Sequence, residues 1–149
     1  VDRSARLLGV PIDSVATQII AERARATPRI ANRILRRIRD FADVLHTGTI
    51  TPAIAEQALT ALSIDGRGLD ALDRRLLETI IDKFAGGPVG LETLAAATSE
   101  EADTLADVHE PFFLLQGMLQ RKKQGRLVTE LAYLHLDLAV PESLLNPVI

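Results

Sequence analysis

Apolar residues recur at helical spacing through most of this chain, and only one short stretch departs from that pattern. The stretch MLQRKKQGRLVT, residues 118–129, indicates two short strands around a turn at Gln124-Gly125. Elsewhere the spacing predicts helices, and the clearest has four apolar residues on one face after the start signal Thr27-Pro28: Ile30, Ile34, Ile38 and Phe41. With aromatic residues at only 3% and no Trp, the core has to be built from aliphatic side chains, which favours helices. We therefore expect a mainly α fold with one short β-hairpin.

The chain divides at a short glycine-containing segment. Residues 1–63 are typical of a compact helical unit, in which Thr51-Pro52 repeats the helix start signal after a predicted helix over residues 12–26. The stretch DGRG lies within residues 64–68, which we expect to form a flexible linker. In residues 69–149 an amphipathic helix is followed by the turn GGPVG, a short helix, and a third helix that Ser99 caps and Pro111 interrupts. Three helices followed by a hairpin is the order of a winged-helix domain.

Positive charge is concentrated although the chain as a whole is acidic. The formal net charge is -3, yet residues 21–40 hold seven arginines. Arg29 stands in the first turn of its helix, where the dipole disfavours a cation and free backbone N–H groups attract anions. Because a guanidinium binds phosphate oxygens in a bidentate manner, Arg29 is a candidate phosphate contact. For the arginine run as a whole, the alternative is a solvated helix face.

The predicted hairpin carries a second basic patch without any acid. Arg121 and Arg126 flank the turn, with Lys122 and Lys123 between them. They would contact a nucleic-acid backbone without reading its sequence, and the alternative is a turn charged for solubility. The third helix is acidic and would be repelled by phosphates, so it either binds a protein or faces water; its carboxylates are Glu100, Glu101, Asp103, Asp107 and Glu110.

The sequence argues against other chemistry. His46, His109 and His135 lack metal-ligand spacing and there is no Cys, so we expect no metal site. The stretch GGPVG lacks the Lys-Ser/Thr of a P-loop, and its glycines are expected to allow a tight turn; no catalytic residue is expected. No apolar run is long enough for a membrane span, and the absence of Cys fits a reducing cytoplasm. Because the chain begins at Val1 without Met, we expect it to be part of a longer protein.

Four stretches resemble the RuvB family, the bacterial motors that drive Holliday-junction branch migration. They are ARATPRIANRILRRIRDFADV, GGPVGLETLAAA, VHEPFFLLQGMLQR and QGR, and they follow the order of the C-terminal part of that family over residues 3–136. The resemblance implies that residues 1–63 are the small lid domain of an AAA+ ATPase and residues 69–149 a winged-helix head domain. It also implies that Arg29 is the sensor-2 arginine, which contacts ATP, and that Arg121 and Arg126 contact DNA.

The same resemblance implies a homohexamer around duplex DNA that uses ATP to move Holliday junctions in recombination and repair. In this family the large ATPase domain binds Mg²⁺ and is the main docking site of RuvA, the junction-binding partner. That domain has no counterpart in this sequence, so we expect the chain alone to be inactive. Two departures concern the predicted contacts: Ala26 replaces a glycine before the Thr-Pro-Arg motif, and residues 122–124 replace Thr-Pro-Arg in the hairpin. The alternative to a motor part is a non-enzymatic helical and winged-helix module that binds a protein.

Overall fold

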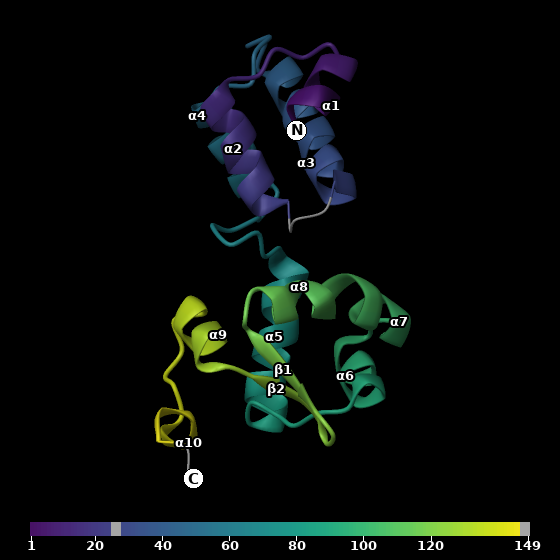
Figure 1. Cartoon of the computed structure of the whole chain (residues 1–149), viewed down its shortest axis with the longest axis vertical. Coiled ribbons are helices and arrows are strands. Elements are labelled where there is room, and N and C mark those ends of the chain that lie inside the picture. Colours follow the sequence, from purple (N-terminus) through teal and green to yellow (C-terminus); the bar gives the residue numbers. More distant parts are fainter. Residues whose placement is uncertain (25–27, 147–149) are drawn as a thin grey trace. The chain divides into compact units, whose positions relative to one another are not determined.

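The computed structural model describes residues 1–24 and 28–146. The chain forms two compact units, Val1–Ala71 and Leu72–Ile149, and each is described here by itself (Figure 1). The expectation of a mainly α fold with a two-stranded antiparallel sheet is confirmed. None of the helices within the described ranges is long and apolar enough to cross a bilayer.

In its described residues the first unit is a bundle of four helices: α1 (Asp2–Leu7), α2 (Ser14–Arg23), α3 (Pro28–Val44) and α4 (Pro52–Ala61). The predicted apolar stripe of α3 is confirmed, because Ile34 and Ile38 are buried while Ile30 and Phe41 are partly buried against the same core. The predicted cap of α4 is also confirmed, since Thr51 Oγ1 accepts a hydrogen bond from the Ile54 N–H. The predicted cap of α3, Thr27, lies outside the described residues.

Helix α2 begins later than its apolar pattern predicted. Asp13 caps it by accepting a hydrogen bond of 2.8 Å from the Val15 N–H. The apolar pattern placed Val15, Ile19 and Ile20 on one side of this helix; Ile20 is buried together with Ala16, whereas Val15 is exposed. The residues before the cap are extended, and Ile12 pairs with Ile50 in a short parallel bridge.

The segment predicted to be a flexible linker forms a hydrogen-bonded turn on the first unit. The carboxylate of Asp65 accepts hydrogen bonds of 3.0 Å from the N–H groups of Arg67 and Leu69, and Leu69 is fully buried. Gly68 has φ 84°, and a Cβ there would lie 2.9 Å from the Arg23 carbonyl oxygen. Glycine is therefore required at this position both by the backbone angle and by the close approach of α2.

The second unit is built from helices around one hairpin. Its elements are α5 (Ala71–Phe84), α6 (Leu91–Thr98), α7 (Ala102–Thr104), the π-helical turn η1 (Leu105–His109), α8 (Glu110–Leu115), β1 (Leu119–Lys122), β2 (Gly125–Val128), α9 (Glu130–His135) and α10 (Glu142–Leu145). Its buried core includes Leu76, Leu77, Ile80, Phe112, Phe113, Met118, Val128 and Tyr133.

The predicted start of the third helix was wrong. Ser99 does not cap it but ends α6 in a left-handed conformation with φ 56°, and the next helical residue is Ala102. The predicted interruption near Pro111 is present as the π-helical turn η1 between α7 and α8, although the chain stays helical throughout. The π-helical turn directly precedes Pro111, whose missing N–H and bulky ring are incompatible with the regular α-helical hydrogen-bond ladder.

The hairpin is present, but its turn lies one residue earlier than predicted. Lys122 pairs with Gly125, so Lys123 and Gln124 form the turn, and Arg121 lies directly opposite Arg126. The GGPVG stretch runs along the other edge of β2, where Val89 and Arg126 exchange two backbone hydrogen bonds of 2.8 and 3.0 Å. A Cβ at Gly125 would collide with the Val89 carbonyl oxygen. The glycines of this stretch do allow a tight turn, with positive φ at Gly86 and Gly87, and they also allow the backbone to approach β2 closely.

Candidate functional site

Arg29 lies exposed in the first turn of α3. Its guanidinium takes part in no hydrogen bond or ion pair between residues that the structure describes. It lines a shallow surface hollow whose other residues are Asn32, Arg33, Arg36, Arg37 and Asp40. The one acid among them, Asp40, lies 2.8 Å from Arg39 in an ion pair. The hollow is therefore strongly positive and suits an anion with several charges, as phosphate groups have.

The two predicted hairpin arginines converge on a single carboxylate, that of Glu110. Arg126 Nε donates a hydrogen bond of 2.9 Å to Glu110 Oε2. Arg121 Nε lies 3.0 Å from Glu110 Oε1 in an ion pair, and this oxygen is buried without a hydrogen bond from any described residue. One carboxylate thus holds one guanidinium from each strand of the hairpin.

The two arginines differ in exposure. The Arg126 side chain is 12% exposed, whereas that of Arg121 is 62% exposed. Beyond Arg121, the exposed side chains of Lys122 and Lys123 extend the positive surface to the turn. A large anion would therefore reach Arg121 and the two lysines before it reached Arg126.

Glu110 does not belong to the exposed acidic face that the sequence predicted. Its side chain is 7% exposed, and Glu100, before the helix begins, is in an ion pair of 3.3 Å with Arg75. The helix and its N-cap residue Glu101 therefore present three exposed carboxylates rather than five: Glu101, Asp103 and Asp107. A clue to the role of Glu110 was available in the sequence, since it falls among the apolar residues of its helix while a basic hairpin follows.

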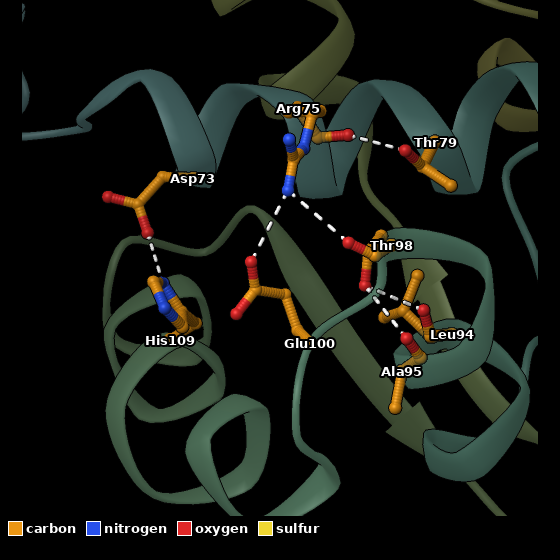
Figure 2. A network of polar contacts seen from close by, with 8 residues as sticks. All are labelled: Asp73, Arg75, Thr79, Leu94, Ala95, Thr98, Glu100 and His109. Carbon is orange, nitrogen blue, oxygen red and sulfur yellow. Dashed lines mark hydrogen bonds and ion pairs between the residues drawn. The ribbon is translucent and has the colours of Figure 1, made fainter.

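A second set of polar contacts joins α5 to His109, to Thr98 at the end of α6 and to Glu100 (Figure 2). His109 Nδ1 lies 2.6 Å from Asp73 Oδ1, and both side chains are buried. Arg75 Nη2 donates hydrogen bonds of 3.3 Å to the Thr98 carbonyl and to Glu100. Consecutive residues thus have different partners, His109 on α5 and Glu110 on the hairpin. Neither His109 nor any other described residue belongs to a group of three or more side chains that could hold a metal ion.

Two family models match the chain in succession. The RuvB AAA lid domain matches residues 1–65, and the RuvB C-terminal winged helix domain matches residues 66–137. The Holliday junction branch migration complex subunit RuvB of Chloroflexus aggregans is 59% identical over 142 residues, which cover 95% of this chain and 41% of that protein. The protein of the same description from Chloroflexus aurantiacus is 58% identical over the same shares. The chain thus spans about two fifths of the length of these relatives.

Solved structures agree with these matches. The Thermotoga maritima RuvB Holliday junction branch migration motor superposes with a TM-score of 0.89 at 47% identity, over 93% of this chain and 47% of that one. The R170A form of Thermotoga maritima RuvB gives a TM-score of 0.90 at the same identity and coverage. The chain therefore belongs to the RuvB family, and it corresponds to the lid and winged-helix domains of that family.

Proposed function

We propose that this chain is the lid and DNA-gripping head of an ATP-driven motor that moves Holliday junctions. The observation that carries the proposal is the succession of a RuvB lid and a RuvB winged helix in one chain, with an exposed basic hairpin on the second. The working protein is a cytoplasmic homohexamer around duplex DNA. RuvA, the junction-binding partner, docks mainly on a large ATPase domain that the chain itself does not contain.

The lid senses nucleotide through Arg29. Its guanidinium, which has no partner among the described residues, is available to a phosphate of ATP, and the surrounding arginines add to the attraction. ATP and Mg²⁺ are held chiefly by the large domain, so Arg29 adds one contact to a site completed elsewhere. Loss of that contact on hydrolysis would change the position that the lid prefers, and the head would move with it.

The head grips DNA through the hairpin. Arg121, Lys122 and Lys123 are exposed and contact phosphates, which is independent of base sequence and suits a motor that traverses any sequence. Arg126 also belongs to this predicted contact, although its guanidinium is largely covered by the pair with Glu110. The three exposed carboxylates of the preceding helix keep that helix away from the phosphates.

The DNA contact is tested by duplex binding as a function of salt. We compare the chain with its Arg121→Ala and Lys122→Ala double variant, using fluorescence anisotropy of a labelled duplex of mixed sequence. Two lost phosphate contacts lower the slope of log affinity against log salt by about 1.8. Arg67→Ala is the matched control, because it removes an exposed cation outside the hairpin and is expected to leave affinity and slope unchanged. An unchanged slope in the hairpin variant would refute the DNA contact and leave the protein-interaction module as the better explanation.

The nucleotide contact is tested in the full-length protein. Arg29→Ala is expected to lower ATP-driven branch migration strongly while leaving DNA binding by the isolated chain unchanged. Arg6→Ala, which removes an exposed arginine of α1, is the control. Normal turnover and migration with Arg29→Ala would rule out the sensor role.

A further inference from the structure

We propose that Glu110 is a positioning residue for the hairpin, and that its buried carboxylate orients the guanidinium of Arg121 toward DNA phosphates. The inference rests on the proposed DNA contact. In the sequence, Glu110 could not be distinguished from the exposed acids of the same helix. Those acids repel DNA phosphates, whereas Glu110 strengthens DNA binding by holding Arg121.

Both arginines contact Glu110 through the same atom. Glu110 contacts Arg121 and Arg126 through Nε, the nitrogen nearest the side-chain stem. The two terminal nitrogens of Arg121 donate no hydrogen bond to any described residue, and the side chain is 62% exposed. A phosphate binds through those terminal nitrogens, so Arg121 can keep its contact with Glu110 while it contacts DNA.

The side chain of Glu110 is buried. A carboxylate this deeply buried is costly unless it is paired, and Arg126 supplies one buried partner. The remaining oxygen, Oε1, is buried and has no hydrogen bond among the described residues, so it attracts the second guanidinium strongly. The pair with Arg126 thereby fixes the carboxylate, and the fixed carboxylate limits the positions that Arg121 can adopt.

The residue before Glu110 is itself fixed by a buried contact. The preceding residue, His109, lies 2.6 Å from Asp73 of α5, and both groups are buried. The start of α8 is therefore fixed to α5, and the backbone of Glu110 belongs to a rigid helix rather than to a loop. An arginine side chain that is free in solution loses much rotational freedom when it binds a ligand. Because Glu110 is itself rigidly held, it can restrict Arg121 before DNA binds, so that less freedom is lost on binding.

The sign of one substitution tests the inference. Simple electrostatics predicts that removing a carboxylate near a DNA-binding surface strengthens binding, whereas loss of positioning weakens it. We expect Glu110→Gln to weaken duplex binding about fivefold to tenfold, because an Arg121 side chain that is no longer held beforehand loses its rotational freedom on binding. The matched control is Asp107→Asn, an exposed acid of the same helix, which is expected to leave binding unchanged or slightly stronger.

A double variant shows whether Glu110 acts through Arg121. In the Arg121→Ala background, Glu110→Gln is expected to have no further effect on affinity or on the salt slope. Tighter or unchanged binding by Glu110→Gln alone would overturn the positioning role, and so would an equal loss in both backgrounds. If Arg121→Ala itself leaves binding unchanged, the DNA contact of the hairpin fails, and the inference fails with it. The two outcomes with Glu110→Gln would refute only the positioning role and leave the DNA contact intact. Failure of the positioning role can therefore be distinguished from failure of the DNA contact.

A measurement on the unsubstituted chain keeps the inference testable if Glu110→Gln folds poorly. The Nε signal of Arg121 in a proton–nitrogen NMR relaxation experiment is expected to show restricted side-chain motion in the free chain, because the ion pair with Glu110 holds the guanidinium, and to keep that restriction when duplex is added. Motion of Arg121 in the free chain as fast as that of Arg67 would mean that Glu110 does not hold it, which contradicts positioning. Arg67, exposed and outside the hairpin, provides the reference for an unrestricted side chain.

Discussion

Replacing Arg126 by Met should destabilise the second unit by leaving Glu110 without its buried partner. Breaking a buried ion pair by removing one side costs about 3–5 kcal/mol. Arg121 remains 3.0 Å from the same carboxylate but is 62% exposed, so it offsets only part of that loss. We therefore expect Arg126→Met to lower the free energy of unfolding of this unit by about 2–3 kcal/mol. Met keeps the apolar length of the side chain, so the change is chiefly one of charge.

The assay needs a signal from the second unit alone, because two units need not unfold together. Tyr133 provides it: it is the one tyrosine of a chain that has no Trp, and it is buried in α9. Urea unfolding followed by Tyr133 fluorescence gives the midpoint directly. With a denaturant slope of about 1 kcal/mol per molar urea, the midpoint should fall by roughly 2–3 M.

Two controls separate the lost ion pair from lost packing. Arg121→Met should cost less than about 1 kcal/mol, because its side chain is exposed. The double variant Arg126→Met with Glu110→Gln should be more stable than Arg126→Met alone, since it removes the unpaired buried charge. The reasoning is refuted if Arg126→Met unfolds with the midpoint of the parent chain, or if the double variant is no more stable than the single one.

Other substitutions and a titration test the remaining structural arguments. Gly125→Ala should destabilise the second unit by more than about 2 kcal/mol, because φ is 133° and the new Cβ meets the Val89 backbone. Gly90→Ala lies in the same unit and its Cβ would meet only Thr93 Oγ1, at 3.9 Å, so it should change stability little in the same urea assay. Ile38→Ala should lower the stability of the first unit by about 3 kcal/mol in circular dichroism and leave the Tyr133 transition unchanged. Burial raises the pKa of Tyr133 above its usual 10.0, so phenolate absorbance should appear at higher pH in the folded chain than in urea. Because the raised pKa favours the protonated folded form, the stability that it contributes is present below pH 10 and falls as pH rises through the folded pKa; coincident titrations in the two states would contradict this.

Features with a local cause could be predicted from the sequence. The α3 stripe and the Thr51 cap depend on residues within one or two turns of helix, so spacing alone was sufficient. The same reasoning failed at Ser99. A serine before an acidic stretch is typical of a helix start, but here it follows α6 and adopts the left-handed conformation that ends a helix.

Contacts between distant residues could not be predicted in this way. Glu110 and Arg126 are 16 residues apart, and the sequence presents them only as one acid of an acidic helix and one base of a basic hairpin. The backbone pairing of Val89 with Arg126 was missed for the same reason, because GGPVG has the composition of a turn and no strand pattern. The count of charges along the sequence predicted which segments are positive. The burial of each charged side chain could be determined only from the folded structure.

The open edge of the hairpin has a consequence for association between copies of the chain. Both edges of β2 are occupied, one by β1 and one by Val89, whereas β1 pairs only with β2 within the part of the chain that the structure describes. An unpaired edge strand can recruit the same strand of another molecule and start aggregation. Here β1 carries Arg121 and Lys122, so two such edges meet with like charges. The cations proposed to hold DNA therefore also keep the strand from pairing with itself when several copies are crowded together.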